Sequence, residues 1–240
     1  MTYNILCGGL PVAGRSDRRE AVENVIRAAA PDVLALQECV GFEVPGAMDA
    51  WAARLGLPHY AIARTTPYTD GLSYNVTVFS RFFMRKRAEF VQKPFQTGAL
   101  LVHIDTPDGV LSLCNVHLHA FNESARLVEI EALLTAFGDA KPDIILGDLN
   151  AISRGDGYAP NDEFESRYDV SDRLAQGYSD LGAPAGMTHP SRLPADHSRQ
   201  IARRIDYVWG REIAGAAVRV VRDEQAHLAS DHFAVVVDFA

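Results

Sequence analysis

The chain has 240 residues, 48% of them hydrophobic and 22% charged, which is typical of one large domain with a full hydrophobic core. Its 23 Lys and Arg residues against 31 Asp and Glu residues give a formal charge of -8, which disfavours strong metal-independent binding to nucleic acid. A phosphate-containing substrate is not excluded, because bound divalent cations reverse the local field of an acidic site. We therefore predict a single domain over residues 1–240.

The cysteines and the amino-terminal residues indicate a cytoplasmic protein. Cys7, Cys39 and Cys114 are odd in number and widely spaced, which favours small buried hydrophobes over a disulfide framework or a CxxC metal site. The segment that begins at Thr2 has no basic region followed by an apolar one, as a signal peptide would. No run of about 18 apolar residues is present to span a bilayer. We expect a monomer in the cytoplasm, without a transmembrane segment.

The first part of the chain alternates strand and helix. Residues 3–7 form a β-prone run before a Gly and Pro turn. A helix is expected from Asp17, a plausible N-cap, and Pro31 ends it. Residues 32–38 then predict a buried strand, and residues 48–55 a short helix.

The pattern changes between residues 60 and 117, where short runs rich in Val, Phe and Leu are separated by turns. Their short connections predict antiparallel hairpins rather than crossovers through helices. The expected strands are residues 75–80, 85–91, 99–105 and 110–117.

A helix over residues 123–137 and a strand over 142–146 restore the first pattern. Residues 152–177 are acidic and predict a long surface loop with a small helix near 172–175, and a second loop covers residues 182–200. Closing strands are expected at residues 205–209, 216–222 and 234–239. This mixture of hairpins and strand–helix units predicts two packed sheets covered by helices.

Polar side chains follow many of the predicted strands. Asp148 and Asn150 follow the buried strand that begins after Pro142, on alternate residues, so both side chains can point at one ligand. An ordinary Asx turn is the alternative. The full set of such residues is Asn4, Glu38, His117, Asp148, Asn150, Asp206, Asp231 and His232.

Each of these residues has an ordinary structural interpretation when taken alone. Asn4 suits a turn, His117 suits a satisfied core histidine, and Asp206 suits an ion pair with Arg204. Their recurrence at the ends of strands instead favours a site for metal or phosphate, since α/β proteins place their chemistry there.

Six segments of the chain resemble, in order, the motifs of the endonuclease/exonuclease/phosphatase superfamily, the DNase-like metal-dependent phosphoesterases. They are Thr2-Tyr3-Asn4, Leu36-Gln37-Glu38, Asn115-Val116-His117-Leu118, Gly147-Asp148-Leu149-Asn150, Arg204-Ile205-Asp206-Tyr207 and Ser230-Asp231-His232. The resemblance covers essentially the whole chain. It implies an α/β fold, a four-layer αββα sandwich of two mixed β-sheets packed face to face and flanked by helices. It also implies a metal-dependent phosphoric ester hydrolase.

The resemblance implies a cofactor of one or two Mg²⁺ or Mn²⁺ ions. Glu38 is the expected carboxylate ligand, with Asn4 beside it, and Asp231 completes a second metal position or a hydrogen-bond network. Hard cations of this kind keep several waters and need few protein ligands.

The remaining motif residues are expected to be catalytic. Asp148 orients or deprotonates the attacking water, and Asn150 holds that water or a phosphate oxygen. His232, with Asp206 behind its imidazole, donates to the phosphoryl group, and His117 is a further phosphate donor. The expected reaction is in-line attack by water, and we expect Asp148 to face solvent.

The substrate is expected to be a small molecule or a lipid head group carrying a phosphodiester or phosphomonoester. His117 supports this expectation, because superfamily members specialised for abasic-site DNA commonly have Tyr in that motif. A DNA or RNA nuclease of the same superfamily is the alternative, and a non-catalytic binding protein with this fold is a remote one.

Two regions depart from the superfamily pattern. The segment around Asn75, a candidate substrate-binding residue, matches it only loosely. The long loop before Arg203 holds Arg192 and Arg199, which suit either a second phosphate of the substrate or a solvated loop. His189 and His197 lie in this Pro-containing loop and could contact substrate, but surface residues are the favoured interpretation.

Overall fold

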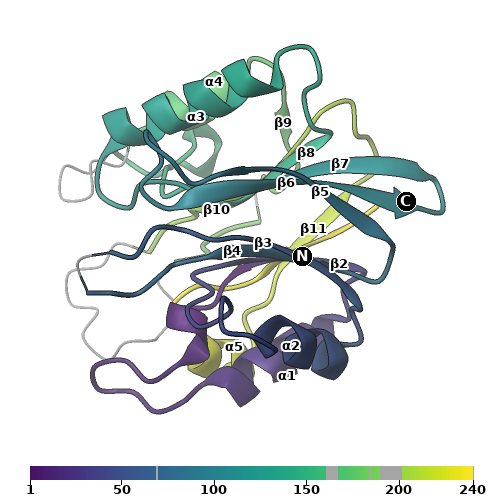
Figure 1. Ribbon diagram of the computed structural model, residues 1–240. Helices are drawn as coiled ribbons and strands as arrows, with labels where there is room; N and C mark the ends of the chain where they lie inside the picture. Colours follow the sequence, from purple (N-terminus) through teal and green to yellow (C-terminus); the bar gives the residue numbers. More distant parts are fainter. Residues whose placement is uncertain (69, 161–166, 184, 190–201, 240) are drawn as a thin grey trace.

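The computed structural model describes residues 1–68, 70–160, 167–183, 185–189 and 202–239. In these residues two six-stranded sheets pack face to face, and helices cover the outer face of each sheet (Figure 1). This arrangement confirms the predicted α/β sandwich. Within the same ranges, no helix is both long enough and apolar enough to cross a bilayer.

The first sheet has the strand order β11-β12-β1-β2-β4-β3. Only β1 and β2 are parallel neighbours in it, and the other pairs are antiparallel. Its strands are β1 (Thr2–Asn4), β2 (Val33–Gln37), β3 (His59–Ala63), β4 (Val76–Ser80), β11 (Ala217–Val220) and β12 (Val235–Asp238).

The second sheet has the order β5-β6-β7-β8-β10-β9, with β7 and β8 parallel. The antiparallel pairing of β5, β6 and β7 confirms the hairpins predicted from their short connections. Its strands are β5 (Met84–Phe90), β6 (Gly98–Thr106), β7 (Gly109–His117), β8 (Ile144–Asp148), β9 (Ser179–Asp180) and β10 (Asp206–Gly210).

Helices form the two outer layers, with α1, α2 and α5 against the first sheet and α3 and α4 against the second (Figure 1). Their bounds are α1 (Arg19–Ala29), α2 (Ala47–Leu55), α3 (Glu123–Phe137), α4 (Asp169–Leu174) and α5 (Glu224–Ala229), with single 3₁₀ turns at Cys7–Gly9 and Arg154–Asp156. The bounds of α3 are those predicted. It begins there because the Asn122 side chain accepts a hydrogen bond from the Ala125 N–H at 2.7 Å, an N-cap.

The first strand is the main difference between the predicted and observed elements, and local hydrogen bonds explain it. The strand predicted over residues 3–7 ends at Asn4, because Leu6 and Cys7 have positive φ angles of 45° and 53°. Their N–H groups donate to side chains instead of to a neighbouring strand. The Leu6 N–H donates to Asn4 Oδ1, and the Cys7 N–H donates to Glu38 Oε2. β3, β9 and α5 were not predicted as separate elements.

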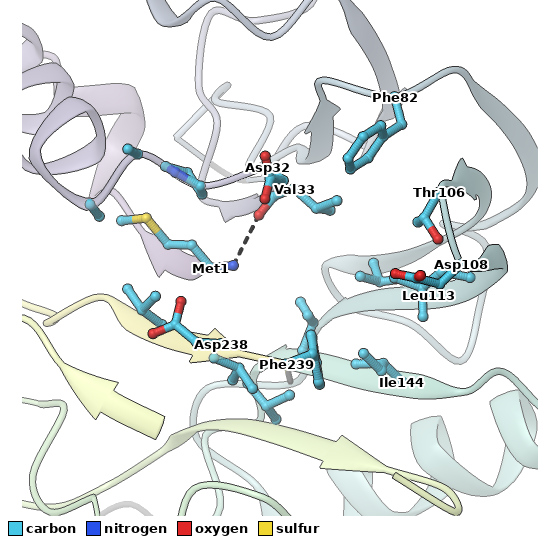
Figure 2. A pocket seen from close by; sticks show the side chains of 18 of the residues that line it. Met1, Asp32, Val33, Phe82, Thr106, Asp108, Leu113, Ile144, Asp238 and Phe239 are labelled. Atoms are coloured by element: carbon cyan, nitrogen blue, oxygen red, sulfur yellow. Dashed lines mark hydrogen bonds between the residues drawn. The ribbon is translucent and has the colours of Figure 1, made fainter. Parts of the chain in front are cut away.

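A cavity of about 630 Å³ lies between the sheets at the amino ends of β2, β7 and β8 (Figure 2). Its walls include Val33, Leu113 and Ile144, and the Met1 amino group beside it donates to the Val33 carbonyl at 2.9 Å. None of the residues lining it belongs to the predicted site. The predicted site residues instead follow the carboxyl ends of these strands, at the opposite end of the sandwich.

Candidate active site

The strand register of the second sheet places three predicted residues side by side. His117 ends β7, Asp148 ends β8, and Asp206 begins β10. His117 and Asp206 are the direct sheet neighbours of Asp148, one on each side. The approach of β8 to β7 requires Gly147 at φ +135°, since a Cβ there would lie 2.0 Å from the Val116 carbonyl oxygen.

Asn4 joins the first sheet to this group. Its Nδ2 donates to Glu38 Oε1 at 3.1 Å and to Asp148 Oδ2 at 3.0 Å, while its Oδ1 accepts from the Leu6 N–H at 3.1 Å. Glu38 lies just beyond β2 with φ 57°, and its Oε2 accepts from the Cys7 N–H at 3.0 Å. One buried amide therefore holds two carboxylates that come from different sheets.

Asp148 lies at the centre of the site and is only 1% exposed. The expectation that it faces solvent is wrong, because side chains from both sheets surround its carboxylate. Oδ1 accepts from the Asn150 N–H at 2.9 Å, and Oδ2 lies 3.6 Å from His117 Nε2 and 3.7 Å from His232 Nε2. The amide of Asn150 is itself held by the Leu118 carbonyl, which accepts from Nδ2 at 3.0 Å.

His232 forms a buried pair with Asp206. Its Nδ1 lies 2.9 Å from Asp206 Oδ2, which leaves Nε2 directed at Asp148. Burial alone would lower the pKa of His232, but the charges of Asp206 and Asp148 outweigh it and raise the pKa to about 10. The imidazole is therefore charged at neutral pH and is suited to donate a proton or a hydrogen bond.

His117 lies on the other side of Asp148 without such support. Its Nδ1 is buried and has no hydrogen-bond partner among the residues that the structure describes. The two imidazoles approach the same carboxylate oxygen but differ in what stands behind them.

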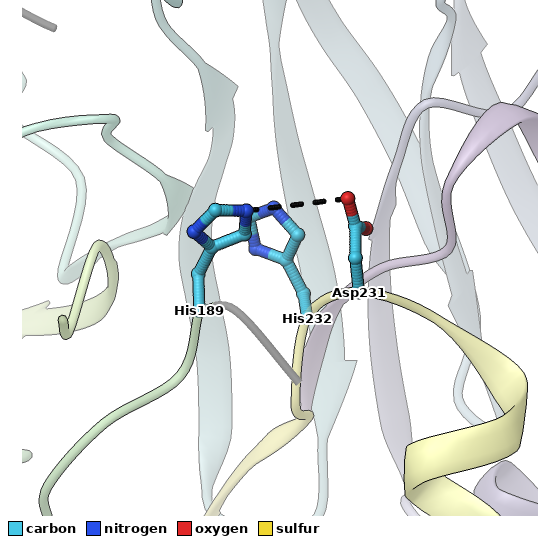
Figure 3. A group of neighbouring side chains, drawn as sticks. All are labelled: His189, Asp231 and His232. Carbon is cyan, nitrogen blue, oxygen red and sulfur yellow. Dashed lines mark ion pairs between the residues drawn. The ribbon is translucent and has the colours of Figure 1, made fainter. Parts of the chain in front are cut away.

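Asp231 and His189 complete one side of the site (Figure 3). Burial, assisted by the charge of Glu38, raises the pKa of Asp231 to about 6, although His232 opposes this shift. His189 Nε2 lies 4.0 Å from Asp231 Oδ2, and the His189 ring lies over that of His232 with centroids 4.6 Å apart. The interpretation of His189 as a surface residue is wrong, since its side chain is only 12% exposed.

The sequence carries little signal for His189. Its backbone pairs with Arg203, just before the Arg-Ile-Asp-Tyr motif, through N–H to carbonyl bonds in both directions. This pairing brings His189 to β10, and only the β-prone residues around Thr188 hint at it. Thr188 also belongs to the frame of the site, because its Oγ1 accepts from the Ile205 and Asp206 N–H groups, each at 3.1 Å.

The donor set predicted for a hard divalent cation fits such an ion in its chemistry. Burial raises the pKa of Asp231 and the negative charge of Glu38 adds to this shift; a divalent cation would relieve such repulsion. Asn4 directs its nitrogen toward the carboxylates and its oxygen toward Leu6. The residues that would hold the ion are thus Glu38 and Asp231, and the ligand role of Asn4 stays a prediction.

Among the candidate substrate-binding residues, the structure describes only Asn75, and the hydrogen bonds of its side chain go to residues other than those around Asp148. Asn75 is buried, and its amide bonds the Cys39 carbonyl, the Glu43 carboxylate and the Thr65 N–H. Arg192 and Arg199 lie outside the described residues, as does His197.

Arg204 does not pair with Asp206, the alternative considered for that carboxylate. It is fully buried and bonded instead to Asp156 and Asp180. Arg204 therefore stabilises the loops behind the site, and Asp206 pairs with His232 instead.

Comparisons with known proteins agree with this geometry. The model of the Endonuclease/Exonuclease/phosphatase family matches residues 1–232 of the chain. None of the curated proteins compared with the chain matches it.

Three solved structures illustrate the shared fold. The chain is similar to an endonuclease/exonuclease/phosphatase family protein from Leptotrichia buccalis C-1013-b, with 15% identity, TM-score 0.75, and coverage of 100% of this chain and 98% of that one. An AP endonuclease from Archaeoglobus fulgidus has 16% identity, TM-score 0.64, and coverage of 91% and 92%. Truncated TDP2 from Caenorhabditis elegans has 18% identity, TM-score 0.59, and coverage of 93% of each chain.

Proposed function

Because the chain belongs to the endonuclease/exonuclease/phosphatase family, whose members are phosphoric ester hydrolases, we propose that it is a divalent-metal-dependent phosphodiesterase. The observation that carries this proposal is the convergence on one buried carboxylate, Asp148, of an amide and two imidazoles from both sheets. Such a centre can activate water and stabilise a phosphoryl group at once.

Each residue has a role that follows from its contacts. Asp148 accepts a hydrogen bond from the attacking water or takes its proton, and Asn150 steadies this carboxylate through its N–H. His232 is charged and donates to a phosphoryl oxygen, while Asp206 orients its ring. His117 supplies a second donor from the far side of Asp148. The reaction is in-line attack of water on phosphorus.

Glu38 and Asp231 would hold the Mg²⁺ or Mn²⁺ ion. When bound, such an ion polarises a phosphoryl oxygen and offsets the charge that develops in the transition state. The contacts of Glu38 with Asn4 and Cys7 keep its carboxylate in one orientation before any ion binds.

We favour a small molecule or a lipid head group as substrate, since the net charge of -8 opposes a long polyanion. A nuclease is the second candidate, because similar structures include an AP endonuclease and an endonuclease domain of the retrotransposon TRAS1.

The test is hydrolysis of bis(p-nitrophenyl) phosphate and p-nitrophenyl phosphate with EDTA, Mg²⁺ or Mn²⁺, followed by supercoiled plasmid. We expect metal-dependent cleavage of the diester and an intact plasmid. Plasmid nicking would replace the small-molecule assignment by the nuclease. Asp105→Asn, which makes the same chemical change at an exposed carboxylate on β6, is the control for Asp148→Asn. A diester rate that Asp148→Asn leaves unchanged would overturn the proposal.

The metal assignment is tested by Glu38→Gln. Losing one of two carboxylates should raise the Mg²⁺ concentration for half-maximal rate by about 10- to 100-fold, with smaller loss at saturating metal. The measurement is the diester rate against Mg²⁺ concentration. An unchanged titration curve would exclude Glu38 as a ligand.

A further inference from the structure

His189, Asp231 and His232 bring three metal-ligating atoms together at the side of the site (Figure 3). One ring nitrogen of each histidine and one carboxylate oxygen of Asp231 all lie within 4.8 Å of one another. His189 comes from the segment whose backbone pairs with Arg203. Asp231 and His232 come from the turn before β12. No family motif identified in the sequence includes His189.

We propose that these three residues form a binding site for Zn²⁺ or a similar transition-metal ion, separate in its donor chemistry from the Mg²⁺ or Mn²⁺ position. Two imidazole nitrogens and one carboxylate oxygen suit Zn²⁺, whereas Mg²⁺ prefers oxygen ligands alone. The fourth position of a tetrahedral ion is left for water or a phosphate oxygen.

The geometry needs only a small contraction. Zinc bonds of about 2 Å place tetrahedral ligand atoms roughly 3.3 Å apart. His189 Nε2 and Asp231 Oδ2 are already 4.0 Å apart. The three ligand atoms lie within 4.8 Å of one another, so side-chain rotations that bring them roughly 1 Å closer would complete the site.

The surroundings hold the ligands in place, as supporting groups do in metal centres. Asp206 binds His232 Nδ1 at 2.9 Å, which fixes the ring, and the ion would displace the proton of Nε2, which is released to solvent. Two backbone hydrogen bonds hold His189 against Arg203. The His189 N–H donates to the Arg203 carbonyl at 2.9 Å, and the Arg203 N–H donates to the His189 carbonyl at 2.5 Å. Asp148 and Asp206 add negative charge, which favours any cation at His232.

Occupation of this site removes groups that the proposed hydrolysis uses. His232 Nε2 would bind the ion instead of a phosphoryl oxygen, and Asp231 would be shared with the Mg²⁺ ligand set. Bound Zn²⁺ is therefore an inhibitor of the Mg²⁺-dependent reaction. This consequence rests on the proposed function, whereas the binding of the metal does not.

The first experiment measures binding without activity. Metal-free full-length protein is titrated with Zn²⁺ by calorimetry and with Co²⁺ by visible absorption, which reports nitrogen and oxygen ligation in a tetrahedral site. His189→Gln removes one ligand, and His103→Gln removes an imidazole on β6, away from the cluster. Since losing a supporting residue costs about 10- to 100-fold in affinity, loss of a ligand should cost ~100-fold or more, and the control should bind as the wild type does.

The second experiment measures inhibition of diester hydrolysis by Zn²⁺ at saturating Mg²⁺, with each variant normalised to its own zinc-free rate. His189→Gln should need ~100-fold more Zn²⁺ than wild type and His103→Gln. Equal Zn²⁺ affinity of wild type and His189→Gln overturns the site. If the wild type hydrolyses no ester, the proposed function fails, but the binding experiment still decides the metal site.

Discussion

Two imidazoles flank Asp148 at nearly the same distance, 3.6 Å for His117 and 3.7 Å for His232, yet their surroundings differ. His232 has Asp206 at 2.9 Å behind its ring, whereas Nδ1 of His117 has no partner in the described part of the chain. The pKa of His232 rises to about 10, because two carboxylates outweigh the opposing effect of its burial. The two imidazoles therefore differ in the group behind each ring, not in their distance from Asp148.

The two sides of Asp148, with His232 beside β10 and His117 on β7, therefore have different roles in the proposed reaction. On the β10 side, Asp206 holds the imidazole of His232, whereas on the β7 side no such carboxylate stands behind His117 among the described residues. Substitutions at the centre should affect both sides, and substitutions on one side should affect them unequally.

The largest effect is expected from Asp148→Asn. Both imidazoles and Asn4 lose their common charged partner, and the water loses its base, so the diester rate should fall by ~10³-fold or more. Because Asp148 is buried, the thermal unfolding midpoint should be measured beside the rate. A large fall in that midpoint would assign the loss to folding, and Asp105→Asn serves as the control.

On the β10 side, His232→Gln should lower the rate by ~10²- to 10⁴-fold, the range for loss of a general acid. Asp206→Asn keeps the imidazole but lowers its pKa, so the alkaline limb of the pH–rate profile should move to lower pH. The measurement is the full pH profile of both variants. A merely structural Asp206 would change the rate at every pH equally.

On the β7 side, His117→Gln should cost less. A hydrogen bond to a charged group contributes ~1.5–3 kcal/mol, which corresponds to about 10- to 100-fold in rate. The alkaline limb should stay where His232 places it. If His117→Gln moved that limb as Asp206→Asn does, the division between the two imidazoles would be wrong.

The smallest effect concerns stability in EDTA. The pKa of His232 is raised from 6.5 to about 10, so the stability from its charged pair is full below pH 6.5 and is lost as pH rises through about 10. Urea unfolding of wild type and His232→Gln should differ most below about pH 6.5, by at most a few kcal/mol, and the difference should vanish as pH rises through about 10. A difference independent of pH would show that His232 is not charged in the folded protein.

Much of this protein was predictable from local pattern. The predicted bounds of α3 are those observed, because apolar spacing and the Asn122 cap act within one helix. The residues that follow β2, β7 and β8 were identified because polar residues after buried strands stand out in sequence. The residues whose side chains meet at the centre, from Asn4 to His232, were nearly all named in this way.

Tertiary structure decided the rest. The burial of Asp148, the place of Asn4 between two carboxylates and the position of His189 against His232 all depend on contacts between the two sheets or across a long loop. Sequence determines which groups a strand delivers to its end, since this depends on alternation within the strand. Which of these groups share a proton or a cation depends on distances between segments far apart in the chain, and only packing sets those distances.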